Sequence, residues 1–160
     1  MHFLHLLLSL FAFPALILAG TGTITSPANG TVILPGQSFA FSYSPKADYS
    51  VSTYNYTVFL LTKLPTSLYS SNEWSSGHYF GRFDYPNYPA VPYPTHPAPA
   101  NLTMPDFSQR VGSGFGGGIN ITDAKVYLAV LEEWATGTNN FGLTISLAIN
   151  ELIYNGTASG

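Results

Sequence analysis

Cysteine is absent from this chain of 160 residues. Disulfides and thiolate metal sites are therefore excluded, and the fold must be stabilised by its core alone. Charge is scarce as well, because only 8% of the residues are charged and the formal net charge is -3. This balance argues against nucleic acid or an anionic membrane as a partner. Solubility must come from hydroxyls, amides and glycans.

Long apolar runs are confined to the start of the chain, where an apolar stretch extends from Leu6 to Ala19. Small residues follow it and suit cleavage after Ala19 or Gly20, so residues 1–20 are predicted to be a secretory signal peptide. A membrane anchor is the alternative, but the stretch is shorter than the ~20 residues that span a bilayer. Residues 21–160 are predicted to form one secreted, extracellular domain with no membrane span.

Five Asn-x-Ser/Thr acceptors lie in the predicted mature region, none with proline in the middle position. A secretory chain with this many acceptors is predicted to be N-glycosylated at several of them, which places those asparagines on the surface. Prediction of secretion does not depend on every acceptor being used. The acceptors are Asn29, Asn55, Asn101, Asn120 and Asn155.

Strand signals dominate the rest of the chain, because Val, Ile, Thr, Tyr and Phe recur in short alternating runs without a long 3.6-residue period. Strands are predicted at 23–26, 31–34, 38–43 and 54–62, with turns at Pro27–Gly30 and Pro35–Gly36. Alternation places Phe39, Phe41 and Tyr43 on one face. In 54–62 the face of Tyr54, Tyr56, Val58 and Leu60 is predicted to be buried, because the acceptor Asn55 belongs to the other face.

A closing hairpin is the clearest predicted element, with strands at 125–134 and 141–153. If Trp134 lies opposite Phe141, the aliphatic pairs of the hairpin all fall on one apolar face. These pairs are Val130 with Ile145, Leu128 with Leu147, and Val126 with Ile149. The same register turns Thr144, Ser146, Ala148 and Asn150 outward, beside Tyr127, Ala129 and Leu131.

The middle of the chain, 64–118, differs in composition from both ends. Six of the twelve prolines fall between Pro86 and Pro99, which favours an extended polyproline-type segment over a helix or a central strand. A Pro/Tyr-rich loop is predicted at 84–99 and a Gly-rich loop at 112–118. Such a connection between two β-rich ends suits an all-β, immunoglobulin-like β-sandwich of about seven strands.

Residues 24–41 follow the pattern I-x-x-P-x-x-G-x-x-I-x-x-G-x-x-F-x-F. This pattern resembles the opening strands of small immunoglobulin-like domains in secreted fungal proteins, namely the Kre9/Knh1-like domain of cell-wall proteins and the Nis1-like group of effectors. The middle of the chain matches neither family, so no site residue is carried over. The resemblance implies a fungal, extracellular and non-catalytic role.

Residues that could carry catalysis are few. Only His78 and His96 follow the predicted signal peptide, so neither a metal site nor a cofactor is expected. Glycoside hydrolysis needs two carboxylates at one cleft. The candidates are Asp84, Asp106, Glu132, Glu133 and Glu151. Glu132 is expected at the end of the apolar face, partly desolvated and able to act as an acid or base. A structural carboxylate paired with backbone donors, Arg82 or Arg110 is the alternative.

Aromatic residues form the most site-like feature of the sequence. Six of them crowd between Tyr79 and Tyr93, among prolines that stiffen the backbone. Rings of this kind suit sugar rings or a partner protein, although they also pack long connections onto sheets. The predicted ligand-binding residues are Tyr79, Tyr85, Tyr88 and Tyr93.

Three functions remain open at this point. The first is a non-catalytic binding module or effector at a fungal cell wall or host interface, with a cell-wall polysaccharide or a host protein as partner. The second is a polysaccharide-active enzyme that uses Glu132 or Asp84. The third is a structural cell-wall glycoprotein without a specific ligand.

Overall fold

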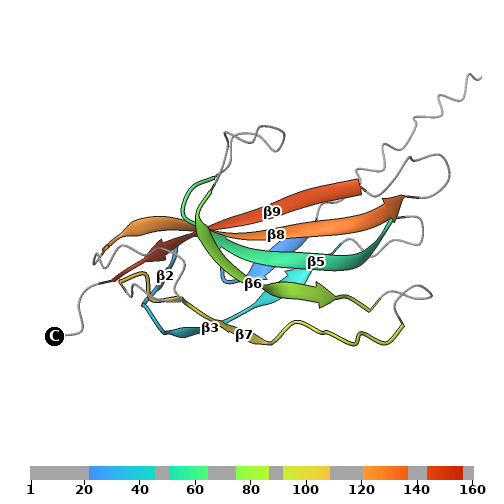
Figure 1. Ribbon diagram of the computed structural model, residues 1–160, viewed down its shortest axis with the longest axis horizontal. Helices are drawn as coiled ribbons and strands as arrows, with labels where there is room; N and C mark the ends of the chain where they lie inside the picture. The colour runs from blue at the N-terminus through green and yellow to red at the C-terminus, as the bar shows by residue number, and fades with distance from the viewer. Residues whose placement is uncertain are drawn as a thin grey trace, which may run out of the picture.

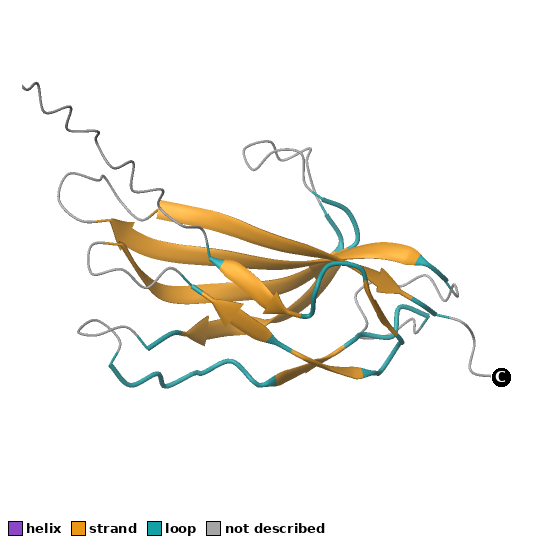
Figure 2. Ribbon diagram, turned by 180° about the vertical axis from the view of Figure 1, so that it is seen from behind, coloured by secondary structure: helices purple, strands orange, loops and turns teal. Residues whose placement is uncertain are grey.

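The computed structural model describes residues 22–45, 51–64, 75–86, 92–108, 121–136 and 144–156. These residues form an all-β structure, and no helix occurs among them. A five-stranded sheet lies against a second layer of shorter strands, as Figures 1 and 2 show from opposite sides. The predicted all-β, sandwich-like fold is therefore confirmed.

The larger sheet has the strand order β2-β9-β8-β5-β6. Its strands are β2 (Thr31–Ile33), β5 (Val51–Leu61), β6 (Gly77–Asp84), β8 (Ala124–Thr136) and β9 (Thr144–Tyr154). All neighbours in this sheet are antiparallel except β2 and β9, which run parallel. The three longest strands, β5, β8 and β9, lie side by side, so the middle of the sheet is its most extended part (Figure 1).

The second layer consists of β1 (Thr23–Ser26), β3 (Ser38–Ala40), β4 (Ser42–Ser44) and β7 (Asn101–Thr103). β1 pairs with β4 and β3 pairs with β7, both antiparallel. Residues 38–43 were predicted as one strand. They change partner halfway, at Phe41, whose N–H donates to the carbonyl of Ala100 at 2.9 Å.

The core fills the space between the two layers. Phe39, Phe41 and Tyr43 are all buried, which confirms that they share the inward face. Tyr56, Val58 and Leu60 of β5 are buried opposite them, whereas Asn55 lies on the other face, as predicted. The turns at Pro27–Gly30 and Pro35–Gly36 are also confirmed, and Gly30 and Gly36 end them with positive φ angles of 78° and 70°.

The predicted register of the closing hairpin is wrong. Trp134 lies opposite Thr144 rather than Phe141, and Val130 lies opposite Ala148 rather than Ile145. This is a shift of three residues, and any odd shift moves a strand's side chains to the opposite face. The inward residues of β9 are Ser146, Ala148, Asn150, Leu152 and Tyr154, whereas Ile145, Leu147 and Ile149 face outward.

Two strands of the middle segment were not predicted. β6 pairs with β5 at the edge of the larger sheet, and β7 pairs with β3 in the second layer. Alternation in β6 is interrupted, because Val58 lies opposite Gly81 and Phe59 opposite Tyr79, which leaves Phe80 as the extra residue of a β-bulge. Residues 92–100 follow without strand structure, whereas the Gly-rich loop 112–118 lies outside the described residues.

Candidate functional site

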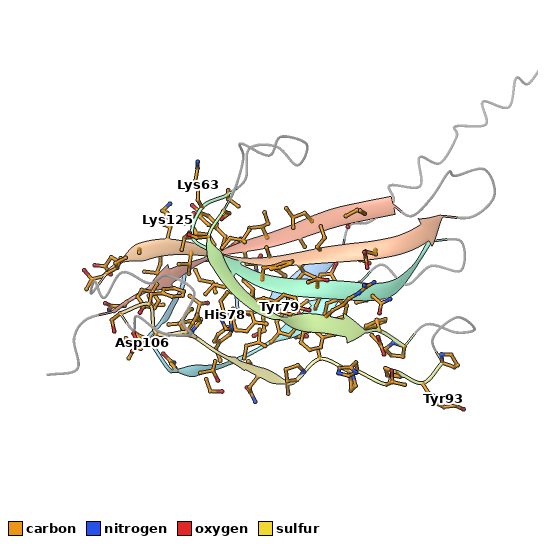
Figure 3. All side chains as sticks on the ribbon, viewed as in Figure 1. Lys63, His78, Tyr79, Tyr93, Asp106 and Lys125 are labelled. Atoms are coloured by element: carbon orange, nitrogen blue, oxygen red, sulfur yellow. The ribbon has the colours of Figure 1, made fainter. Side chains whose placement is uncertain are left out.

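The tyrosines that were predicted to bind a ligand lie in different surroundings. Tyr79 on β6 is 57% exposed, and Tyr93 in the Pro/Tyr-rich connection is 86% exposed. Tyr85 instead packs against the core, and Tyr88 lies outside the described residues. Tyr79 and Tyr93 are also far apart, at the middle and at one end of the molecule (Figure 3). The described tyrosines of this set therefore do not form a single site.

Tyr79 belongs to a larger apolar surface on the outer face of the five-stranded sheet, which is the face turned away from the second layer. Along one row of this face, Phe59 lies between Tyr79 and Ala129, and Ala129 lies opposite Ile149. The rings of Phe59 and Tyr79 are 5.5 Å apart between centroids. This row crosses four neighbouring strands, from β6 to β9.

Neighbouring rows extend this surface, which we name the apolar band. In the next row Leu131 of β8 lies between Thr57 and Leu147. Ile145 and Leu147 are 56% and 37% exposed, so the band is open to solvent. The apolar band comprises Phe59, Leu61, Tyr79, Tyr127, Leu131, Ile145, Leu147 and Ile149. Sequence reasoning missed it because the hairpin was placed with its aliphatic residues inward.

Two ion pairs flank the apolar band. Arg82 of β6 pairs with Glu133 of β8, and the two side chains reach each other across the intervening strand β5. Lys125 and Glu151 pair at 2.9 Å nearer the other end of the sheet. An apolar centre with a polar rim is the arrangement that binding surfaces show.

The free edge of β6 is protected against pairing with another strand. The bulge at Phe80 interrupts the edge, Gly81 has a φ angle of 150°, and the charged Arg82 follows. Bulges and charged residues of this kind prevent edge-to-edge pairing. Recognition at this sheet is therefore expected to use side chains of the outer face rather than addition of a β-strand.

Asp84, one of the two candidate catalytic carboxylates, anchors the Pro/Tyr-rich connection. Its carboxylate accepts hydrogen bonds from the N–H and hydroxyl of Thr95 at 3.0 and 2.9 Å and from the N–H of His96 at 3.0 Å. Its own N–H donates to the carbonyl of His96 at 2.8 Å. The hydrogen bond from the Thr95 hydroxyl is the main reason that the pKa of Asp84 is lowered.

This anchor predicts a pH dependence. Because the pKa of Asp84 is depressed, its stabilising contribution is complete above the usual carboxyl value of 3.8 and is lost as the pH falls through the lower folded value. We expect the Thr95 and His96 amide resonances to titrate together, with a midpoint below 3.8. NMR titration of the wild type and of Asp84→Asn, in which this transition should be absent, tests the prediction. A midpoint at or above 3.8 would contradict it.

Glu132, the other candidate, is buried inside the sandwich. It is 1% exposed and accepts a hydrogen bond from the hydroxyl of Tyr43, so a polysaccharide chain would not contact it. The prediction that Glu132 lies at the end of the inward face is confirmed. Its predicted partner Arg82 pairs with Glu133 instead, and the hydroxyl of Tyr43 donates to Glu132. Asp84 lies opposite Asn55 in the register of β5 and β6, so its side chain is on the outer face of the sheet, whereas Glu132 is on the inner face. The two carboxylates therefore do not share a cleft, and Arg110 lies outside the described residues.

The two histidines do not approach each other. His78 stacks edge-on against Phe80, with ring centroids 4.8 Å apart, and burial lowers its pKa. His96 lies in the exposed connection beside Asp84. Within the described ranges, no group of three or more His, Asp or Glu side chains could hold a metal ion.

The glycan acceptors differ in their surroundings. Asn29 and Asn101 are exposed, and the Oδ1 atom of Asn29 accepts a hydrogen bond from the N–H of Glu151 at 2.8 Å. Asn55 is half-buried on the outer face, whereas the Oδ1 atom of Asn155 is buried without a hydrogen-bond partner. Asn120 lies outside the described residues.

Comparison of the chain with protein-family models, with curated proteins and with solved structures found no match. Among the described segments there is also no helix with the length and hydropathy that crossing a membrane requires.

Proposed function

We propose that this chain is a secreted fungal glycoprotein that acts as a non-catalytic binding module at a cell wall or host interface. The observation that carries this proposal is the apolar band on the outer face of the larger sheet. Soluble proteins rarely leave a contiguous apolar surface exposed unless it binds something. Here three large side chains, Tyr79, Ile145 and Leu147, are each more than a third exposed on one face.

An immunoglobulin-like sandwich is the finer fold that we propose. Its support is the strand order, because β9, β8, β5 and β6 follow the order G-F-C-C′ of that fold's variable type. The other layer, in which β1 pairs with β4 and β3 with β7, corresponds to its strands A, B and E. On this correspondence the apolar band covers the outer face of the G-F-C-C′ sheet.

A neutral polysaccharide is the ligand that the chemistry of this surface favours. A broad apolar face with the Phe59 and Tyr79 rings can pack against the flat faces of sugar rings, and the adjacent Arg82–Glu133 pair offers donors and acceptors to hydroxyls. The chain has few charges and a net charge of -3, so an anionic ligand is disfavoured.

Retention on insoluble chitin, β-1,3-glucan and cellulose tests this proposal. We expect the wild type to be retained on one of them and Tyr79→Ala to weaken retention about tenfold, the equivalent of roughly 1.4 kcal/mol. Tyr93→Ala is the matched control, because Tyr93 is exposed but lies far from Tyr79, and it should retain wild-type binding (Figure 3). Loss of binding in Tyr93→Ala alone would place the site in the connection. Absence of retention on all three polymers would reject a polysaccharide ligand.

A further inference from the structure

The outer face of the larger sheet also carries Asn55, one of the predicted glycan acceptors. Asn55 lies on β5 and takes part in neither of the two ion pairs on this face. Asn55 and the acceptor threonine Thr57 alternate with buried residues of β5, so both lie on the outer face. Phe59 of the apolar band is the next residue of β5 on this face. An N-glycan on Asn55 would therefore begin directly beside the apolar band.

Among the described acceptors, Asn55 has the geometry that suits a glycan lying on the protein. Within the described residues its side-chain amide makes no hydrogen bond, whereas the Oδ1 atom of Asn29 accepts one from the N–H of Glu151. Asn101 is on the short strand β7 of the other layer and points to solvent. Among the described acceptors, Asn55 is the one that lies within a strand of the larger sheet, because Asn29 and Asn155 lie outside its strands.

The distance from the acceptor to the apolar band is short. Four residues along a strand separate Asn55 from Phe59, which is about 13 Å. A core of several sugar rings covers such a distance. Between the two positions, the Arg82–Glu133 pair crosses β5 and presents charged hydrogen-bonding groups that sugar hydroxyls can use. Beyond it, the Phe59 and Tyr79 rings offer apolar faces to the C–H faces of the sugars.

We propose that the N-glycan on Asn55 lies across the outer face and covers the apolar band, so that occupancy of this acceptor controls access to the band. This inference rests on the proposed function in that the chain is secreted and glycosylated. It also gives the band a regulator, because a polysaccharide and the chain's own glycan would compete for the same rings. The glycoform with an empty Asn55 is then the one that binds more tightly.

Side-chain footprinting with hydroxyl radicals tests this without any added ligand. In the glycosylated protein, Thr57→Ala removes the acceptor motif but keeps Asn55, and we expect oxidation of Tyr79 and Leu147 to rise at least threefold. Thr103→Ala, which removes the Asn101 acceptor by the same change, should leave both rates as in the wild type. Thr57→Ser, which keeps the motif, should also behave as the wild type. Mass spectrometry of the Asn55 peptide establishes occupancy in each sample.

Protein made without glycans separates the effect of the Asn55 glycan from the effect of changing the Thr57 side chain. In that material the wild type and Thr57→Ala should oxidise equally at Tyr79 and Leu147, because neither carries the sugar. The proposal is overturned if Asn55 is unoccupied in the secreted wild type, or if it is occupied and Tyr79 oxidises equally in both glycosylated proteins. It is also overturned if the wild type is a dimer whose Tyr79 stays protected without glycans, which would make a second copy the occupant.

Polysaccharide retention of the same variants separates this inference from the proposed function. If both are right, glycosylated Thr57→Ala should bind about tenfold more tightly than the wild type, a gain of roughly 1.4 kcal/mol. A glycan-dependent footprint with no retention on any polymer would support the covering glycan and reject the polysaccharide ligand. Retention that is equal in both proteins, with equal footprints, would reject the covering glycan and leave the proposed function standing.

Discussion

Leu128→Ala is expected to lower the free energy of unfolding by about 2–5 kcal/mol, the usual cost of truncating a fully buried leucine. Leu128 is fully buried in the centre of β8, facing the second layer. Leu147→Ala removes the same atoms from β9, but Leu147 is 37% exposed on the outer face. We expect the latter change to cost about 1 kcal/mol, because the side chain is already partly exposed and its truncation leaves no closed cavity. Urea unfolding of the unglycosylated protein measures both.

The comparison distinguishes two registers of the closing hairpin. In the register predicted from the sequence, Leu128 and Leu147 face each other in the core, and both variants would lose comparable stability. In the structure, Leu128 lies opposite Asn150, and Leu147 lies opposite Leu131 on the outer face. Equal and large losses in the two variants would therefore contradict the structure and return the aliphatic residues of β9 to the core.

The register of the closing hairpin could not be predicted from the sequence, for a physical reason. Alternation with a period of two identifies the two faces of each strand, but it does not say which face of β9 matches the inward face of β8. Both faces of β9 carry apolar residues, with Ile145 and Leu147 on one and Leu152 and Tyr154 on the other. The larger aliphatic set was assumed to be inward, and a shift of three residues reversed it.

Asn150 shows why the polar residues of β9 were misleading. The register predicted from the sequence turned it outward, together with Thr144, Ser146 and Ala148. In the structure it faces inward near the edge of the core, and its Nδ2 atom donates to the carbonyls of Ile24 and Pro27 at 3.2 and 2.8 Å. Those acceptors are more than a hundred residues away in the chain. No local pattern could have indicated that they would satisfy the amide.

Local sequence signals were sufficient to predict the two turns that separate β1, β2 and β3. Gly30 and Gly36 end turns that need positive φ angles, and these turns fix where β1, β2 and β3 begin and end. The candidate site was harder to predict from the sequence, because the bulge at Phe80 interrupts the alternation of β6. The aromatic cluster therefore looked like a loop, although Phe80 packs inward and Tyr79 faces outward. Only the pairing with β5 separates these two roles.

Tyr43→Phe should lower the free energy of unfolding by about 2–3 kcal/mol, because it removes a hydrogen bond to a buried carboxylate and leaves that acceptor without this donor. Glu132 is 1% exposed, and the Tyr43 hydroxyl donates to it from the second layer. Burial, and next the hydrogen bond to Glu132, raise the pKa of Tyr43, so the hydroxyl remains a donor at ordinary pH. Gly22 lies against the same pair, where a Cβ atom would collide with both side chains.

Tyr56→Phe is the matched control for this change. Its ring packs against Tyr43 with centroids 5.1 Å apart, and burial raises its pKa to about 12, but it makes no hydrogen bond to Glu132. Deleting this hydroxyl should cost at most about 1 kcal/mol. A double-mutant cycle then isolates the pair, because Tyr43→Phe should cost only about 1 kcal/mol in the Glu132→Gln background, where the acceptor is neutral. Equal costs of Tyr43→Phe in both backgrounds would mean that the charged hydrogen bond does not hold the two layers together.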